Sequence, residues 1–168
     1  MSLPSSTRAL ASVPLVRVPQ ICALVLLLGS GCARGTTLPE AAGRLESDSR
    51  GVLADGARKL GVPGARPRIA VDDRHPCGDG RARQVLRGTV PLRRGPDPRI
   101  DLDDATDVTI GLARARGYRL EHPPTFTRRF RTFTMARDDS IVRMVVQVHG
   151  GHHSSLSVDA STACLPGT

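Results

Sequence analysis

The longest amphipathic stretch of the chain covers residues 38–60. Thr37 and Glu40 have the spacing of a capping box at its start, Pro39 fits the first helical turn, and Gly61 stands at its end. The pattern therefore predicts a helix over residues 38–60. Its expected buried face consists of residues at helical spacing: Leu38, Ala42, Leu45, Ser49, Val52, Leu53 and Leu60.

Shorter patterns follow this helix. Residues 68–73 and 83–92 favour two strands, joined by a turn-rich loop at residues 76–80, and residues 93–98 are typical of a loop. A second helix is expected to begin at Asp103 or Asp104 as its N-cap and to end at Gly117. Its expected buried residues are Ala105, Val108, Leu112 and Ala115.

The rest of the chain alternates with a period of two residues, which is typical of half-buried strands. Four strands are predicted, over residues 118–121, 126–135, 141–149 and 154–160, with hairpin turns at residues 137–140 and 150–153. The predicted order is α-β-β-α-β-β-β-β. It favours an α+β fold, a two-layer sandwich in which an antiparallel meander sheet carries two helices on one face. The side chains expected to face the helices from one strand are Val142, Met144, Val146 and Val148, whereas Arg143, Gln147 and His149 face outward.

The first 31 residues have the pattern of a secretory signal peptide. A polar segment with Arg8 and Arg17 precedes an apolar run at residues 21–28, and small residues lead to Cys32. The apolar run is shorter than the roughly 20 residues that a transmembrane helix needs. Gly29, Ser30 and Gly31 before Cys32 resemble a bacterial lipobox, in which the cysteine is diacylated.

This resemblance implies three parts in the chain. Residues 1–31 form a lipoprotein signal peptide, residues 32–36 a lipidated Cys32 with a short tether, and residues 37–168 a single α+β domain. We expect the protein at the outer face of the cell membrane, or secreted if the signal is simply cleaved and Cys32 is not lipidated. Two acyl chains on one cysteine suffice for stable anchoring.

The charge balance changes when the signal peptide is excluded. The chain has 24 basic and 16 acidic residues and a net charge of +8. Removal of Arg8 and Arg17, with no acidic residue lost, lowers it to +6. All basic residues except Lys59 are arginines. Such a bias is typical of a high-GC genome, and outside the cytoplasm we expect no nucleic-acid partner.

Two of the four cysteines belong to the expected signal peptide and its lipid anchor. Cys22 lies in the apolar run and Cys32 is the expected anchor, which leaves Cys77 and Cys164 in the domain. An even pair in an oxidising compartment predicts a disulfide between them. The alternative is that these cysteines form a reactive thiol or a metal-binding pair. The sequence contains no CxxC motif, which argues against this alternative.

The whole chain resembles small actinobacterial cell-envelope lipoproteins of unknown function. The resemblance rests on the lipobox-like start and on three short motifs in order, at residues 74–78 (RHPCG), 115–118 (ARGY) and 163–166 (ACLP). It implies an envelope location and the Cys77–Cys164 disulfide. It implies no activity, cofactor or site residue.

Three histidines, His149, His152 and His153, fall in one predicted hairpin turn, and imidazole is a common ligand of Zn, Cu and Ni. A closed structural site needs four ligands, and no cysteine or carboxylate at ligand spacing completes this set. We therefore expect a solvated polar turn and no cofactor, and keep a metal site as the alternative. His75 and His122 join the set only if the fold brings them close.

Two charged groups invite similar alternatives. An acidic run lacks the glycine and glutamate of an EF-hand and is better explained by the start of a helix. A group of arginines near the late strands favours either edge-strand protection or binding of anionic lipid or an acidic wall polymer. The acidic run is Asp97, Asp101, Asp103, Asp104 and Asp107, and the arginines are Arg128, Arg129, Arg131, Arg137 and Arg143.

Enzymatic motifs are missing from the sequence of the domain. It contains no GxSxG, SxxK or phosphate-binding glycine loop, and Ser155 and Ser157 beside His152 and His153 do not make a catalytic triad by proximity in sequence. The expected function is a non-enzymatic, lipid-anchored domain that binds an envelope protein, anionic lipid or wall polymer. The alternatives are a metal- or small-ligand-binding lipoprotein, which would use the histidine turn or a cleft between helices and sheet, and a small hydrolase.

Overall fold

The computed structural model describes residues 36–95, 97–137 and 141–167. The expected signal peptide, Cys32 and the tether up to residue 35 lie outside the described residues, as do residues 138–140 of a predicted turn. The helices are α1 (Leu38–Leu60) and α2 (Pro98–Arg114). The strands are β1 (Arg68–Gly78), β2 (Arg81–Pro91), β3 (Arg119–Leu120), β4 (Thr125–Phe126), β5 (Phe130–Arg137), β6 (Val142–His149), β7 (Ser155–Thr162) and β8 (Leu165–Pro166).

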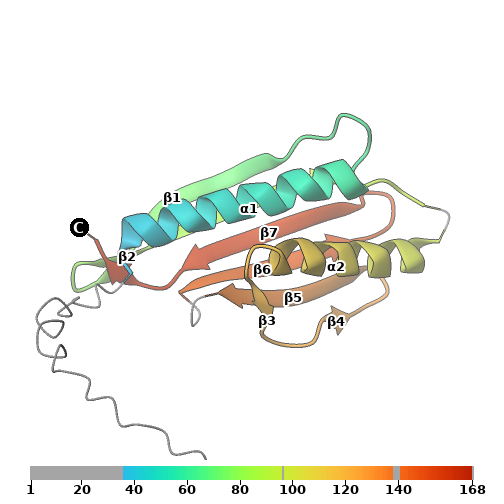
Figure 1. Ribbon diagram of the computed structural model, residues 1–168. Helices are drawn as coiled ribbons and strands as arrows, with labels where there is room; N and C mark the ends of the chain where they lie inside the picture. Colours follow the sequence, from blue (N-terminus) through green and yellow to red (C-terminus); the bar gives the residue numbers. More distant parts are fainter. Residues whose placement is uncertain (1–35, 96, 138–140, 168) are drawn as a thin grey trace, which may run out of the picture. The chain divides into compact units, whose positions relative to one another are not determined.

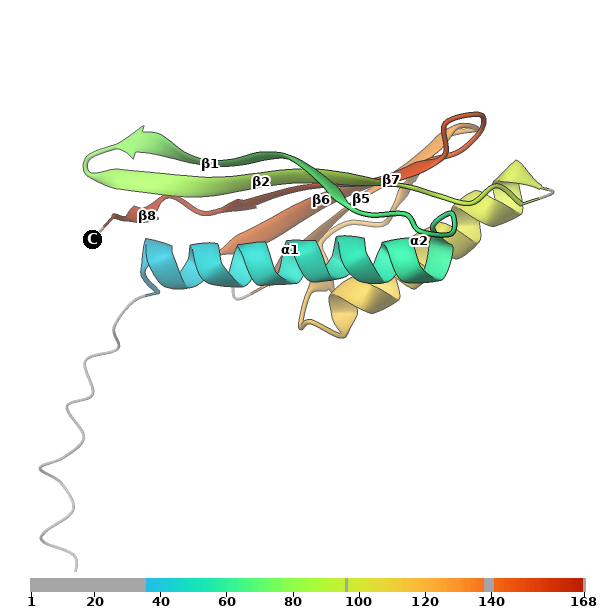
Figure 2. The same ribbon diagram turned by 90° about the horizontal axis from the view of Figure 1, so that it is seen from above.

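The strands form one antiparallel sheet, and both helices cover the same face of it (Figures 1 and 2). The strand order is β1-β2-β7-β6-β5-β3, with β4 paired to β5 and β8 paired to β2. α1 packs on β2 and β7, and α2 packs on β5 and β6 and beside α1. The predicted α+β sandwich is confirmed. The meander holds for β5, β6 and β7, and the β1–β2 hairpin joins the sheet at β7.

The core lies between α1 and the central strands. Leu45, Val52 and Leu53 of α1 are fully buried, and β6 alternates between buried and outward-facing residues as its pattern predicts. The α1 boundaries are also confirmed: the Thr37 amide donates to the Glu40 carboxylate at 3.1 Å, and the Gly61 amide donates to the Ala57 carbonyl at 3.0 Å. Neither helix in the described part of the chain is long and apolar enough to cross a membrane.

The second helix corrects the sequence prediction. α2 begins at Pro98, five residues before Asp103 and six before Asp104, the two expected caps, and the amide of Asp101 donates to the carbonyl of Asp97 at 3.0 Å. Proline is compatible with the first helical turn, so the segment expected to be a loop continues into a helix. The expected buried residue Ala115 is exposed and lies past the helix end.

The buried face of α2 includes two threonines instead. The hydroxyls of Thr106 and Thr109 donate to the carbonyls of Leu102 and Ala105, each at 2.7 Å. Because these bonds satisfy the hydroxyl groups inside the helix, both threonines are buried without a loss of hydrogen bonding.

Two strand boundaries also differ from the prediction. β1 extends through the expected loop to Gly78, so that only Asp79 and Gly80, both at positive φ, separate it from β2. β1 is an edge strand, where a proline is tolerated, and Pro76 lies beside a register shift. The predicted strand over residues 126–135 is divided into β4 and β5 by a turn.

The predicted disulfide is present. Cys77 and Cys164 are joined with 6.1 Å between their Cα atoms and 87 residues between them in sequence. The bond connects β1 to the segment between β7 and β8, and therefore fixes the end of the long hairpin to the C-terminal part of the sheet.

One ion pair joins the two helices at their packed sides. Arg116, just after α2, donates to Asp55 of α1 at 2.6 Å, and both side chains are about four-fifths buried. The hydrogen bond and positive charge of Arg116 hold the pKa of Asp55 below its ordinary value, against the opposing effect of burial.

Replacing Asp55 with Asn should lower the free energy of unfolding at neutral pH by about 1–2 kcal/mol, because a charge-assisted hydrogen bond is lost. The folded pKa is depressed, so this stabilisation is present above the ordinary aspartate pKa and is lost as the pH falls through the folded value. Denaturant unfolding at pH 7 and at a more acidic pH should show a larger difference from wild type at the higher pH than at the lower. An equal difference at both pH values would contradict the role of the ion pair.

Candidate anion-binding site

Three loops meet at the end of the sheet where β6 turns into β7. The amide of Leu92, after β2, donates to Ser154 O of the β6–β7 turn at 2.9 Å. The amide of Gly150 in the same turn donates to Arg129 O of the β4–β5 turn at 2.8 Å. These backbone bonds fix the β6–β7 turn to the segments on both sides of it.

The surface over this end contains two depressions, of about 860 Å³ and 720 Å³. They adjoin at His152, His153 and Ser155, which line both, and we name the two depressions together the basic groove. Among the residues lining it, none is acidic. Its charged and imidazole side chains are Arg66, Arg68 and Arg94 on one flank, Arg128 and Arg129 on the other, and His149, His152 and His153.

The groove arginines lack the carboxylate partners that several other arginines of the domain have. Arg87 pairs with Asp159 at 2.7 Å and Arg143 with Glu121 at 2.8 Å, and Arg50, Arg116, Arg131 and Arg137 also have carboxylate partners. Among the described residues, no carboxylate pairs with any of the five groove arginines. The groove therefore carries positive charge that the domain itself does not neutralise.

The five arginines that lie close together in the sequence of the late strands have different roles in the structure. Arg131, Arg137 and Arg143 bind Asp103, Asp48 and Glu121 and have structural roles. Only Arg128 and Arg129 of that group line the groove.

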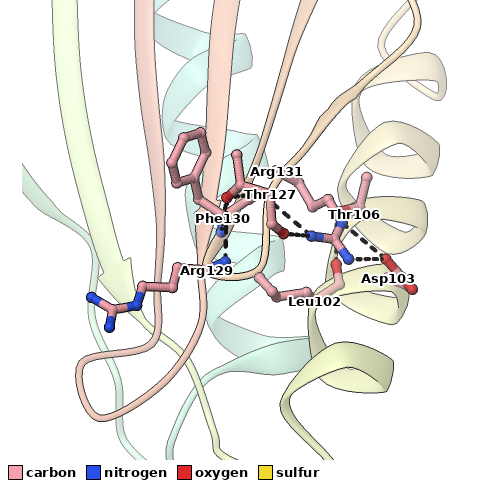
Figure 3. Close-up of polar contacts among 7 residues, drawn as sticks. All are labelled: Leu102, Asp103, Thr106, Thr127, Arg129, Phe130 and Arg131. Carbon is pink, nitrogen blue, oxygen red and sulfur yellow. Dashed lines mark hydrogen bonds and ion pairs between the residues drawn. The ribbon is translucent and has the colours of Figure 1, made fainter.

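Arg131 is a buried cation that fixes the position of the β4–β5 turn (Figure 3). Its Nε and Nη2 donate to Asp103 Oδ1 of α2 at 2.9 and 2.8 Å, and its Nη1 donates to Thr127 O. Its guanidinium also lies 5.0 Å from the centre of the Phe126 ring. One side chain thus connects α2, β5 and the turn that carries Arg128 and Arg129.

Thr127 closes the same turn from within. Its Oγ1 accepts hydrogen bonds from the amides of Arg129 and Phe130 at 3.2 and 3.0 Å, and its own amide donates to Phe130 O at 3.0 Å (Figure 3). A hydroxyl that binds the following amides stabilises a turn locally. The backbone that presents Arg128 and Arg129 is therefore held in place before any partner binds.

The three histidines line the groove without converging on a common point. His149 lies beside Phe130, with 6.0 Å between ring centres, and His152 Nδ1 lies 3.5 Å from Arg94 Nη1. Within the part of the chain that the structure describes, no group of three or more His, Cys, Asp or Glu side chains is placed to hold a metal ion. His75 and His122 do not line the groove.

A smaller cavity of about 190 Å³ lies next to the groove, between the end of α1 and the start of α2. It has mixed charge, with Lys59 and Arg93 against Asp101 and Asp104. Within the acidic run, Asp101 accepts a hydrogen bond from the Gly95 amide at 2.7 Å, and Asp103 pairs with Arg131. These two carboxylates therefore hold loops and helix together.

The two serines considered for catalysis have different surroundings. Ser155 lines the groove with His152 and His153, whereas the Ser157 hydroxyl lies 3.4 Å from the Gln147 carbonyl of β6. No carboxylate of the described residues lines the groove to orient an imidazole, as a triad requires.

Three of the five groove arginines were not predicted from the sequence. Arg66, Arg68 and Arg94 are distant in sequence from the histidine turn, and the pairing of β1 with β2 and of β2 with β7 brings them to it. A comparison of the chain with protein-family models, with curated proteins and with solved structures finds no match. The function is therefore inferred from the geometry and charge of the chain itself.

Replacing Asp103 with Ala should lower the free energy of unfolding by about 1–3 kcal/mol, because it leaves the buried Arg131 guanidinium without its carboxylate. Asp103→Asn retains an oxygen at the position of Oδ1, which accepts both bonds, and should cost less. Denaturant unfolding of both variants measures the difference. Equal losses in the two variants would contradict the assignment of Asp103 as the acceptor that holds Arg131.

Proposed function

We propose that this chain is an exported, lipid-anchored envelope protein whose domain binds an anionic partner, without catalysis, in the basic groove. Cys32 is the lipidated residue. The observation that carries the proposal is the gathering of five arginines, without carboxylate partners among the described residues, around two adjoining depressions.

The chemistry of the groove favours phosphate or carboxylate groups as ligands. Arginine offers several N–H donors in a planar fork that matches both groups. The histidine rings and the Ser155 hydroxyl add further polar contacts at the centre of the groove. Unpaired charges of one sign in a concave surface also raise the local concentration of oppositely charged molecules.

The fixed loops around the groove support a binding role. Arg131 and Thr127 hold the turn that presents Arg128 and Arg129, and backbone bonds hold the β6–β7 turn. A site that is organised before binding loses less conformational entropy when its ligand arrives. Export, the compartment and the resemblance to envelope lipoproteins make an envelope component the proposed partner.

The proposal predicts that removing groove charge weakens binding of a polyanion more than removing the same charge elsewhere. Arg128→Ser/Arg129→Ser should bind long-chain polyphosphate about tenfold more weakly than wild type. The matched control, Arg87→Ser/Arg143→Ser, removes two arginines that pair with Asp159 and Glu121 outside the groove. Calorimetric titration at fixed salt measures the three affinities.

Equal weakening in the groove variant and the control would indicate attraction by net charge alone and would contradict a specific site. Thermal unfolding of both variants identifies any loss that comes from misfolding. Binding that does not weaken as salt rises would also count against the proposal, because exposed ion pairs are screened by salt.

The anchor has its own test. Cys32→Ser should move the protein from the membrane fraction of its host to the soluble extracytoplasmic fraction, because no lipid can be attached to serine through a thioether. Mass spectrometry of the wild-type N-terminal peptide should show a diacylglycerol increment on Cys32. Unchanged membrane association of the variant would show that Cys32 is not the anchor.

A further inference from the structure

We propose that the ligand of the basic groove is an extended anionic polymer, bound at the end of the domain that points away from the bilayer. This inference rests on the proposed function and adds the form of the ligand and the direction of the site. Three observations carry it: the position of the groove on α1, the charge of the long faces, and the separation of the two flanks.

The groove and the attachment point of the tether lie at opposite ends of α1. The helix begins at Leu38, next to the tether, and its last turn contains Lys59, which lines the cavity beside the groove. At 1.5 Å per residue, these positions are roughly 30 Å apart along the helix axis. Figure 2 shows the same arrangement, with the start of α1 near β8 and its end near the β6–β7 turn. The groove therefore lies at the end of α1 that is distal to Leu38.

The helical face and the centre of the open sheet face offer little attraction for an anionic bilayer on which the domain would lie flat. The two helices, which cover one face, contain six basic and eight acidic residues. At the centre of the open face of the sheet, Arg87 and Arg143 are both paired with carboxylates, whereas the exposed Arg81 and Arg83, toward the β1–β2 hairpin, have no carboxylate partner among the described residues. Uncharged residues form a row straight across four strands of that face: Thr132, Gln147, Ser157 and Thr89.

The two flanks of the groove are too far apart for one small anion. Arg128 and Arg129 come just before β5 and Arg94 just after β2, and the sheet places β6 and β7 between these strands. Three strand spacings of about 4.8 Å separate the flanks by roughly 14 Å. A single phosphate reaches one flank, whereas a chain of repeated phosphate or carboxylate groups reaches both across His152 and His153.

The form of the ligand is tested by length dependence. The protein with its native lipid, in neutral vesicles, is titrated with long-chain polyphosphate and with triphosphate at equal phosphate concentration. We expect the long chain to bind at least about tenfold more tightly. Arg94→Ser/Arg129→Ser, which removes one arginine from each flank, should abolish most of that advantage, and Arg87→Ser/Arg143→Ser should retain it.

Equal affinities for the long chain and triphosphate would overturn the polymer assignment while leaving the groove as an anion site. Failure of both probes to bind would instead contradict the proposed function itself. Polyglutamate in place of polyphosphate distinguishes carboxylate from phosphate as the preferred group.

The direction of the site is tested by energy transfer in the same vesicles. A donor dye is attached to Val62→Cys, beside the groove, or to His75→Cys, on the β1–β2 hairpin at the opposite end, and the acceptors are in the lipid headgroups. We expect less transfer from position 62 than from position 75. Equal or greater transfer from position 62 would overturn the orientation.

A last experiment tests whether lipid headgroups, and not a polymer, occupy the groove. If the unanchored Cys32→Ser chain binds vesicles of an anionic lipid, and Arg94→Ser/Arg129→Ser abolishes that binding, lipid headgroups occupy the groove and the polymer assignment is wrong. We expect no such groove-dependent vesicle binding.

Discussion

The packing of α1 against β2 and β7 is the constraint on which the domain depends. Leu45, Val52 and Leu53 lose all contact with solvent there, and burial of each such side chain stabilises the fold by about 1.5–3 kcal/mol. The approach is close: a Cβ at Gly88 of β2 would lie 2.5 Å from Leu53 Cδ1, and one at Gly56 would lie 2.7 Å from Leu156 Cδ2. A side chain at either position would therefore force the facing leucine to shift. The same contacts make α1 a rigid element between the tether and the groove.

The arginines of this domain include a set of structural ion pairs and, within the described residues, the unpaired set of the groove. Arg116, Arg131 and Arg137 are partly or fully buried and bind carboxylates that join α1, α2 and the sheet. Such cations must be paired, because an isolated buried charge is costly. Exposed arginines carry no such requirement, and in the groove five of them gather without a carboxylate among the described residues. The arginines that join the helices to the sheet are therefore different from those that line the groove.

The sequence was informative where a local pattern determines the structure. The period of α1 and the alternation of β6 are set by burial on one face, and both were predicted within a few residues. The start of α2 was missed because Pro98 permits a helix before the acidic residues that looked like caps. Ala115 was misplaced because α2 ends at Arg114, and the buried face of the helix instead includes Thr106 and Thr109, whose hydroxyls are satisfied within the helix.

The candidate site was only partly accessible to sequence reasoning. The histidine turn and Arg128 and Arg129 are local features and were identified. Arg66, Arg68 and Arg94 reach the groove through the pairing of β1 with β2 and of β2 with β7, and the second pairing spans most of the domain and leaves no local signal. The buried role of Arg131 was likewise hidden, because its partner Asp103 lies on a helix 28 residues earlier.

The central claim is that a polyanion binds in the basic groove, and amide chemical shifts recorded during titration with long-chain polyphosphate test it most directly. The largest changes are predicted at residues 66–68, 93–95, 127–130 and 149–155, on both flanks and along the β6–β7 turn. Changes confined to the open face of the sheet around Gln147, Ser157 and Asp159, or to the β1–β2 hairpin, would contradict it.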